Sequence, residues 1–446
     1  MSTSPVVIVG AGWAGLTAAA ELAARGHRPL LLESAKQTGG RARKVAFADQ
    51  AVDNGQHLFI GAYHHTLSQL YRFGLNPEEL FERHPLQLQV QHRNGRCLEM
   101  QAPALPAPLH LLWALLGARG LSFNSRWRAV KFGWRLARGK LLGQNDQSVL
   151  SLLQRWHQTP ELIEQLWTPL CLAIMNTPIE ESSAELFVNV LQDAFLKQRQ
   201  DSDLLYARRD LGNLFNEPAM QYIERQGGEV RLGRRVLQLQ INHQGIQGVV
   251  TGNGEIETQH VILAVPPRTT AALCESYPEL ASLEEQCKAF TYEPICTVYL
   301  QYPASVALSR PMIGLLDGIG QWVFDRRLYG QPGLMAVVIS SNGTHMRLTN
   351  AELIDRIAAE LAEHFPDWHS HEQASVIREK RATFASQVGI NLRRPTNQTA
   401  INGLWLAGDY TRSNYPATLE GAVQSGLQCA ALAHHAIQTS KQDSTP

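Results

Sequence analysis

The first clear pattern of apolar and polar residues lies at the start of the chain. Val6 to Val9 is a β-branched run, and it ends in the glycine-rich turn Gly10-Ala11-Gly12-Trp13-Ala14-Gly15. The next segment, LTAAAELAARG, has the composition of a helix that ends at Gly26. A second apolar run, RPLLLE, ends in Glu33. The pattern predicts a strand, a glycine turn, a helix and a second strand, which is the unit of a parallel sheet.

Two further runs predict a sheet of another kind. Residues 296–302 read CTVYLQY and residues 335–340 read MAVVIS, and both are rich in β-branched and aromatic residues. They lie far from the glycine turn in the sequence. We therefore expect a second domain with a mixed sheet.

A polar interruption divides the apolar run 51–63, AVDNGQHLFIGAY. Its five residues, Asp53, Asn54, Gly55, Gln56 and His57, stand where a strand would bury them. Asn-Gly is also ordinary turn chemistry. The pattern alone leaves open whether this segment is a turn or part of a functional site.

Length and composition indicate a globular protein with more than one domain, because 446 residues with 44% apolar content exceed one hydrophobic core. Forty basic and forty acidic residues give a net charge of +0, so no overall field attracts nucleic acid. The six cysteines form no C-x-x-C pair, which argues against a metal site or disulfides and fits a reducing cytoplasm. We expect no signal peptide and no segment with the ~20 apolar residues of a membrane span.

The glycine turn predicts a dinucleotide site. Gly10 permits the tight turn, Gly12 lets the backbone approach a pyrophosphate, and Gly15 allows the helix to pack closely on the strand. Glu33 follows at about the 20-residue offset at which a carboxylate accepts hydrogen bonds from a ribose. These residues do not tell which dinucleotide binds.

The tract TGGRAR at 38–43 adds two glycines and two arginines. Gly39 and Gly40 let backbone approach an anion, and Arg41 and Arg43 can neutralise phosphates or a reduced flavin. Two surface arginines beside a loop are the alternative.

Taken together, GAGWAGL, Glu33 and GGRAR resemble the start of the flavin-containing amine oxidase and carotene desaturase superfamily. Residues 404–426, LWLAGDYTRSNYPATLEGAVQSG, resemble the segment that completes its FAD site. The resemblance implies that Gly408 and Asp409 meet the ribityl or pyrophosphate part of FAD. It also implies that Thr418, Leu419 and Glu420 open a helix directed at the flavin, and that the backbone of Val236 meets adenine.

The resemblance implies an α/β fold with a Rossmann-like FAD-binding domain built from residues 1–90, 205–280 and 395–438. Residues 90–205 and 280–395 would form a mixed-sheet and helical substrate domain, and 439–446 a polar tail. With one glycine fingerprint in the chain, electrons must come from an external donor. The expected cofactor contacts are Gly10, Gly12, Trp13, Ala14, Gly15, Glu33, Ser34, Gly40, Arg41, Arg43, Gly55, Gln56, His57, Val236, Gly408, Asp409, Thr418, Leu419 and Glu420.

Within the superfamily, Thr418 stands where amine oxidases have an aromatic wall, so a cationic amine substrate lacks support. The segment GQHLFIGAY at 55–63 resembles carotene desaturases. DNGQH at 53–57 and EKRATFA at 379–385 resemble the squalene-associated FAD-dependent desaturase family of hopanoid synthesis, now understood as hydroxysqualene dehydroxylases. That resemblance implies reduction of hydroxysqualene to squalene. A carotene or squalene desaturase with a quinone acceptor, and a non-catalytic prenyl-lipid carrier of the GDP-dissociation-inhibitor type, are the alternatives.

The expected catalytic residues are His57, Gln56 and Asp53. His57 is the first candidate for the acid that assists departure of the hydroxyl group, because histidine can hold a proton near neutral pH. A histidine that only shapes the flavin pocket is the alternative.

The segment 104–142 is basic and rich in tryptophan. No acidic residue occurs from 101 to 145. On a helix, Trp127, Val130, Trp134 and Leu141 share one face. This pattern predicts interfacial helices on anionic lipid, with a solvated basic helix as the alternative, and we expect a cytoplasmic protein on the inner face of the membrane. The adjoining basic stripe comprises Arg128, Lys131, Arg135 and Arg138.

Overall fold

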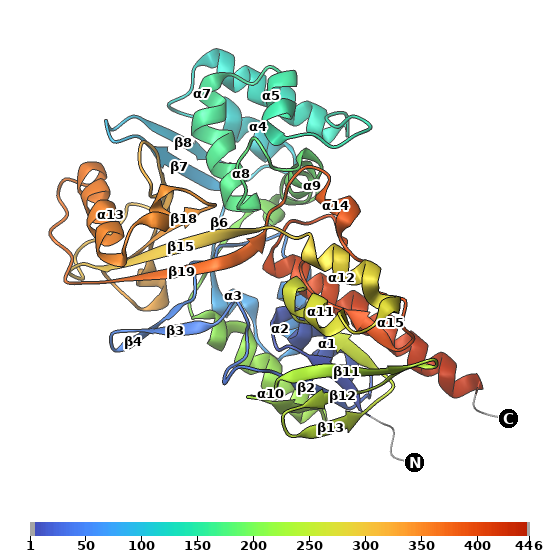
Figure 1. Ribbon diagram of the computed structural model, residues 1–446. Coiled ribbons are helices and arrows are strands. Elements are labelled where there is room, and N and C mark those ends of the chain that lie inside the picture. The colour runs from blue at the N-terminus through green and yellow to red at the C-terminus, as the bar shows by residue number, and fades with distance from the viewer. Residues whose placement is uncertain (1–4, 444–446) are drawn as a thin grey trace.

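The computed structural model describes residues 5–443, and its first sheet is a parallel one (Figure 1). The strands are β1 (Val6–Val9), β2 (Pro29–Leu32), β10 (Glu229–Arg231), β14 (Val261–Leu263) and β20 (Leu404–Leu406). Their order in the sheet is β10-β2-β1-β14-β20. Four of the five strands are buried at every residue, as expected when both faces of a parallel sheet are covered.

Alternate residues of β1 enter two different cores because side chains alternate across a strand. Val6 and Ile8 pack with helices on one face of the sheet, and Val7 and Val9 pack on the other face. The helices of the first face are α1 (Trp13–Ala24), α10 (Glu217–Arg225) and α15 (Leu419–Asp443). The other face is covered by β11 (Val236–Asn242), β12 (Gly245–Thr251), β13 (Gly254–Glu257), α11 (Pro267–Cys274) and α12 (Ala281–Lys288).

Helix α15 reaches further than the sequence predicts. The expected polar tail begins at residue 439, but the helix continues to Asp443. Residues 444–446 of that expected tail lie outside the described residues.

The second sheet is mixed and has seven strands. Its members are β19 (Gln373–Phe384), β15 (Tyr292–Gln301), β18 (Leu334–Ser340), β17 (Trp322–Asp325), β16 (Met312–Leu315), β7 (Gln87–Gln91) and β8 (Cys97–Gln101), in this order. All neighbours are antiparallel except β16 and β7. The domain boundary expected at residue 90 therefore falls inside β7, and the strand belongs to the mixed sheet. Helix α13 (Asn350–His364) packs on one face of this sheet.

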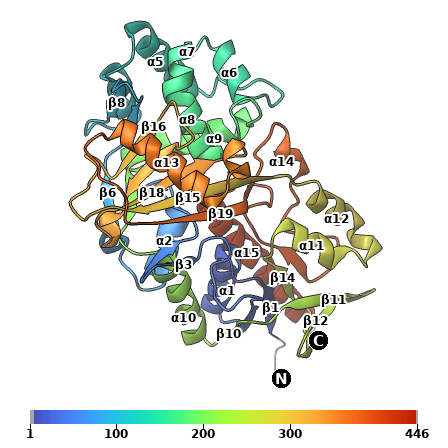
Figure 2. The ribbon, with the colours of Figure 1, turned by 60° about the vertical axis from the view of Figure 1, so that its left-hand side comes forward.

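A helical layer lies beside the mixed sheet, at the end of the molecule farthest from the parallel sheet (Figures 1 and 2). Its helices are α4 (Leu109–Leu116), α5 (Phe123–Ala137), α6 (Val149–Arg155), α7 (Pro160–Leu162), α8 (Thr168–Met175) and α9 (Ala184–Phe195). Helix α5 ends earlier than the sequence pattern predicts, and Leu141, expected on its exposed face, lies beyond the helix and is buried. The physical reason is Gly139, whose φ of +63° takes the chain out of the helical conformation.

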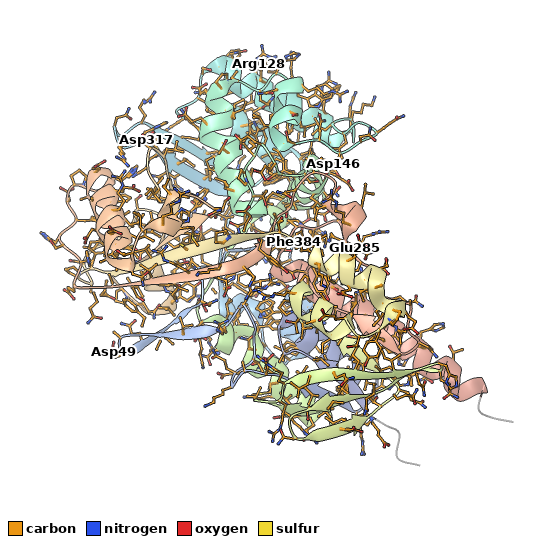
Figure 3. All side chains as sticks on the ribbon, viewed as in Figure 1. Asp49, Arg128, Asp146, Glu285, Asp317 and Phe384 are labelled. Carbon is orange, nitrogen blue, oxygen red and sulfur yellow. The ribbon has the colours of Figure 1, made fainter. Side chains whose placement is uncertain are left out.

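Short elements connect the two sheets. They are the hairpin β3 (Lys44–Phe47) and β4 (Gln50–Asp53), the small sheet of β5 (Phe59–Ile60), β9 (Leu204–Ala207) and β6 (Phe81–His84), and helices α2 (His64–Arg72), α3 (Pro77–Leu80) and α14 (Ile390–Arg393). Phe384, labelled in Figure 3, ends β19 where the two parts of the chain meet, and it packs against Phe290. All six cysteines are free thiols. None of the helices within residues 5–443 is both long enough and apolar enough to cross a membrane.

Candidate functional site

The three glycines of the first turn meet different surroundings. A Cβ added to Gly10, whose φ is +107°, would lie 2.6 Å from the carbonyl oxygen of Ala264, and one added to Gly15 would lie 1.9 Å from that of Gly10. A Cβ on Gly12 would meet no protein atom within 4 Å. Gly10 and Gly15 are therefore required by the fold, whereas Gly12 borders open space where helix α1 begins. Backbone amides and the helix dipole favour a phosphate in such a place.

Glu33 connects the second strand to this turn. Its Oε2 accepts a hydrogen bond of 2.8 Å from the backbone N–H of Ala11, and its Oε1 accepts one of 2.8 Å from that of Ala35. The hydroxyl of Ser34 also donates to Oε1, at 3.1 Å. A carboxylate has about four lone-pair sites, so Glu33 retains acceptor capacity for ribose hydroxyls. The backbone N–H of Arg234 donates to the carbonyl oxygen of Glu33, which brings the start of β11, at Val236, close to the same turn.

The second glycine tract lies directly beside the first. The N–H of Gly39 donates to the carbonyl oxygen of Ala11 at 2.8 Å, and a Cβ on Gly40 would lie 3.4 Å from the Cα of Gly12. Arg43 donates from Nη1 to the carbonyl oxygen of Gly40 at 2.7 Å. The two tracts, residues 10–15 and 38–43, thus form one backbone surface, which we call the cradle. The hydrogen bond from Arg43 stabilises the second tract.

Arg41 joins this cradle to the end of the chain. Its Nη2 lies 2.7 Å from Asp409 Oδ1, and its Nη1 donates to the carbonyl oxygen of Ala382 at 2.8 Å. Asp409 is buried. The N–H of Gly408 next to it donates to Ser425 Oγ on helix α15.

The start of α15 only partly follows the expectation from the sequence. Thr418 caps the helix, because its Oγ1 accepts a hydrogen bond from the N–H of Gly421, and Leu419 is the first helical residue. The buried carboxylate of Glu420, however, accepts from the N–H groups of His65 and Thr66, both at 2.9 Å. The Glu420 side chain therefore caps helix α2.

The polar residues 53–57 contact segments distant in the sequence. Asn54 Nδ2 donates to Glu379 Oε2 at 3.1 Å and to the carbonyl oxygen of Arg41 at 3.3 Å. Tyr299 donates its hydroxyl to the carbonyl oxygen of Asp53 at 2.9 Å. The segment is therefore not a hairpin turn: strand β4 ends at Asp53, and the segment forms hydrogen bonds with Tyr299 of β15 and Glu379 of β19.

Arg326, which the sequence did not single out, is the centre of a buried polar cluster. Its side chain is 1% exposed. Nη1 donates to Gln56 Oε1 at 2.5 Å and lies 3.6 Å from Asp53 Oδ2, while Nε donates to Gln331 Oε1 at 2.7 Å. The guanidinium stacks 3.9 Å from the ring of Tyr329, to whose hydroxyl Gln56 Nε2 donates at 3.0 Å.

Burial shifts the pKa values of the two ionisable groups of this segment, Asp53 and His57, in opposite directions. It raises the pKa of the Asp53 carboxyl to about 6, against the lowering effect of Arg326. It lowers the pKa of the His57 imidazole to about 4. His57 is therefore neutral near pH 7, whereas Asp53 is protonated up to about pH 6.

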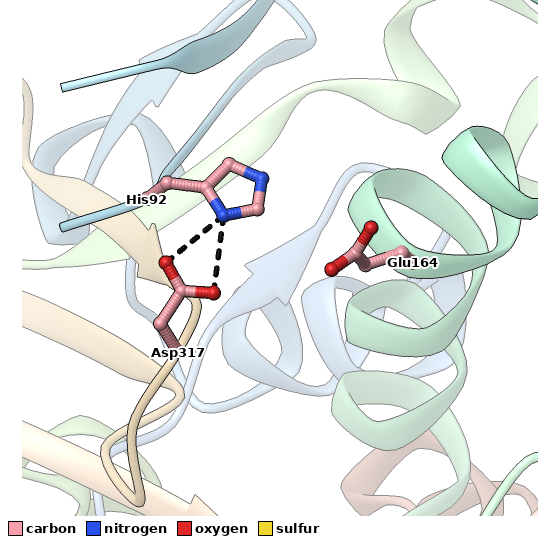
Figure 4. A group of neighbouring side chains, drawn as sticks. All are labelled: His92, Glu164 and Asp317. Carbon is pink, nitrogen blue, oxygen red and sulfur yellow. Dashed lines mark hydrogen bonds and ion pairs between the residues drawn. The ribbon is translucent and has the colours of Figure 1, made fainter. Parts of the chain in front are cut away.

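A separate group of potential metal ligands lies near the helical layer. His92, Glu164 and Asp317 have ligand atoms within 4.8 Å of one another (Figure 4). His92 Nδ1 already lies 3.0 Å from Asp317 Oδ2, and Glu164 is exposed. This geometry is that of a hydrogen-bonded histidine and carboxylate, and it supports no metal assignment.

Fold and cradle together define a dinucleotide-binding protein with a second, substrate-binding part. The family model of the flavin containing amine oxidoreductases matches residues 13–434, so the chain belongs to that family. The hydroxysqualene dehydroxylase of Zymomonas mobilis is 27% identical over 451 residues, which cover 96% of this chain and 98% of that one. The 15-cis-phytoene desaturase of Glycine max is 26% identical and covers 95% of this chain and 78% of that one. A putative protoporphyrinogen oxidase from Exiguobacterium sp. 255-15 has the same fold, with a TM-score of 0.71 at 17% identity over 98% and 100% of the two chains.

The chain is therefore an FAD-dependent oxidoreductase. The residues present fit that cofactor: Gly12 leaves space for the pyrophosphate, and Glu33 keeps acceptor capacity for a ribose. Two buried polar atoms, Trp13 Nε1 and His57 Nδ1, also have no hydrogen-bond partner among the described residues.

Proposed function

We propose that this flavoprotein catalyses the reductive dehydroxylation of hydroxysqualene to squalene, a step of squalene and hopanoid biosynthesis. The observation that carries the proposal is the 3.1 Å hydrogen bond from Asn54 Nδ2 to Glu379 Oε2. It joins the two segments, 53–57 and 379–385, whose residues resemble this family most specifically. The hydroxysqualene dehydroxylase of Sinorhizobium fredii, 28% identical over 96% of this chain and 98% of that one, supports the same proposal.

The proposed reaction consumes one hydride and one proton. The allylic C–O bond breaks, its oxygen leaves as water, and the hydride forms the new C–H bond. When bound in its reduced form, FAD supplies the hydride, and an external donor restores its electrons. The remaining requirement is a group that holds the proton that is transferred to the leaving hydroxyl.

We assign that proton to Asp53. Its Oδ2 has no hydrogen-bond partner among the described residues, and its pKa of about 6 keeps the carboxyl partly protonated near neutral pH. His57, the first candidate from the sequence, has a pKa of about 4 and carries no extra proton to donate. His57 then shapes the flavin pocket, while Gln56 and Arg326 position Asp53.

The same residues and cofactor also suit oxidation. The phytoene desaturase relatives support a second candidate, a carotene or squalene desaturase that passes electrons to a quinone. A non-catalytic prenyl-lipid carrier has less support, because the open space at Gly12 and the Arg41–Asp409 pair are features of a cofactor site.

An experiment with two arms tests the direction of electron flow. Reduced enzyme is incubated with hydroxysqualene without oxygen, and oxidised enzyme is incubated with squalene or phytoene and a quinone. We expect squalene from the first arm, identified by mass spectrometry, and no product from the second. Product from the second arm alone would replace the proposal by the desaturase, and purified protein without flavin absorbance would favour the carrier.

A further inference from the structure

Helices α4 and α5 lie at the end of the molecule farthest from the parallel sheet (Figure 1). Both helices expose large apolar side chains to solvent. Single exposed apolar residues need no explanation, but a cluster on two neighbouring helices does. We call this cluster the aromatic surface. It consists of Leu109 and Trp113 of α4, with exposures of 47% and 57%, and Phe123, Trp127 and Trp134 of α5, with exposures of 78%, 48% and 54%.

Helix α5 has two apolar faces. Ala129, Phe132 and Leu136 are buried and pack on the rest of the protein. Phe123, Trp127 and Trp134 follow at i, i+4 and i+11, which places them on the opposite face. A helix that packs on one core needs one apolar stripe, so the second stripe indicates a second apolar contact.

Basic side chains border the aromatic surface and contact it. Lys131 Nζ lies 5.6 Å from the centre of the Trp127 ring, and the Arg138 guanidinium lies 3.7 Å from that of Trp134. Arg128, labelled in Figure 3, lies at the outer edge of the molecule. The charge of this border is not cancelled within the segment, because no acidic residue occurs between 101 and 145.

Glu161 is an acidic residue that contacts α5, and its contacts stabilise the start of this helix. Glu161 accepts hydrogen bonds from the N–H and the hydroxyl of Ser122, the N-cap of α5. A carboxylate there stabilises the positive end of the helix dipole. It lies at the first turn, whereas the basic side chains extend to the other end of the helix.

We propose that the aromatic surface docks α4 and α5 in the plane of an anionic lipid bilayer. Tryptophan and phenylalanine rings then enter the boundary between headgroups and acyl chains, and the bordering arginines and Lys131 contact lipid phosphates. A bilayer fits this surface because it offers an apolar layer directly beneath a layer of negative charge. The parallel sheet, at the opposite end of the molecule in Figure 2, stays in water.

Retention on lipid vesicles tests the proposal, and it needs neither substrate nor turnover, so its outcome is independent of the proposed reaction. The intact flavoprotein is mixed with vesicles of phosphatidylcholine alone or with phosphatidylglycerol added, and bound protein is measured by flotation. We expect binding to the anionic vesicles that weakens as salt is raised. Binding should fall about 100-fold or more in a variant with its basic border neutralised. That variant carries Arg128→Gln, Lys131→Gln, Arg135→Gln and Arg138→Gln.

A second variant, Trp127→Gln with Trp134→Gln, tests the apolar half of the proposal and should lose binding even at low salt. Controls with the same chemistry at the opposite end of the molecule should bind as the wild type does. The charge control carries Arg28→Gln, Lys36→Gln, Arg234→Gln and Arg235→Gln, all exposed in the structure, and the apolar control carries Leu237→Gln. Equal retention of all variants would overturn the proposal. So would a wild-type dimer in sedimentation that the tryptophan variant alone dissociates, because a second copy would then cover the surface.

Discussion

Arg41 Nη2 lies 2.7 Å from Asp409 Oδ1, and this ion pair joins residues 368 positions apart. The pair connects the cradle near the start of the chain to the segment before the last helix. Because Asp409 is buried and Arg41 is partly exposed, the arginine is the side of the pair that a ligand can approach.

Asp409→Asn should weaken FAD binding by about tenfold or more, because the uncharged amide loses the charge-assisted hydrogen bond that holds Arg41. Titration of the apoprotein with FAD, followed by flavin fluorescence, measures the change. Lys288→Gln, which breaks an exposed ion pair with Glu284, is the control and should bind FAD as the wild type does. Unchanged affinity in Asp409→Asn would show that the pair does not support the cofactor.

Gly12→Ala and Gly15→Ala should fail in different ways. The Gly12→Ala methyl meets no protein atom within 4 Å, so this variant should fold normally and lose FAD affinity. The Gly15→Ala methyl would lie 1.9 Å from the carbonyl oxygen of Gly10, so that variant should fold poorly or not at all. Circular dichroism and flavin content distinguish the two defects, and Gly252→Ala, also in open space, is the control. Full flavin content in Gly12→Ala would contradict the position assigned to the pyrophosphate.

Arg326→Met should destabilise the protein by roughly 3–5 kcal/mol, because it leaves Asp53 without its buried partner. The neighbouring Arg327→Met should cost about 1 kcal/mol or less, since Arg327 is 42% exposed and the buried Asp325 keeps its hydrogen bonds from the backbone N–H groups of Leu308 and Arg327. Urea unfolding measures both values. Adding Asp53→Asn to Arg326→Met should recover part of the loss. If the double variant loses the sum of the two single losses, Arg326 and Asp53 are not coupled.

Acidification should destabilise the wild type through His57. Its folded pKa of about 4 lies below the ordinary value of 6.5, so the unfolded chain binds the proton more readily between these values. The free energy of unfolding therefore falls as the pH decreases through this window, by roughly 2–3 kcal/mol from His57 alone. His57→Gln removes this contribution, so the stability difference between wild type and variant should shift by that amount between neutral pH and about pH 4. If the free energies of unfolding of the two proteins change equally with pH, the burial of the imidazole is contradicted.

The rate of the proposed reduction should depend on the protonation of Asp53. A proton donor with a pKa of about 6 is active below that pH, so the single-turnover rate should fall about tenfold per pH unit above it. Asp53→Asn should lower the rate on the order of 100-fold and abolish this dependence, while His57→Gln should keep it. Stopped-flow absorbance of the flavin with hydroxysqualene measures the rate. An intact pH profile in Asp53→Asn would remove Asp53 as the proton donor.

The features that the sequence predicted correctly depend on local requirements. A strand, a glycine turn and a helix leave a readable pattern because the positive φ of Gly10 and the close contact at Gly15 tolerate no side chain. The resemblance to a flavoprotein family placed the parallel and mixed sheets in the correct fold class.

The features that the sequence did not reveal depend on contacts between distant segments. Arg326 and Arg327 are adjacent, yet one is buried and the other exposed, and the contacts of the Arg326 side chain with Gln56 and Asp53 distinguish them. Glu420 caps a helix 355 positions away. The periodicity of α5 suggested that Leu141 continues its exposed face, but Gly139 ends the helical geometry first.

The order of strands in the parallel sheet also has a consequence for biosynthesis. Strand β1 pairs with β14, more than 250 residues later, and β20 completes the sheet at Leu406. A ribosome therefore exposes β1 and its neighbour β2 long before β14, the strand on the other side of β1, exists. The mixed sheet also has its last strand, β19, only at Phe384. The nascent chain consequently carries two unfinished sheets through most of its translation, the condition under which exposed strand edges need protection by chaperones.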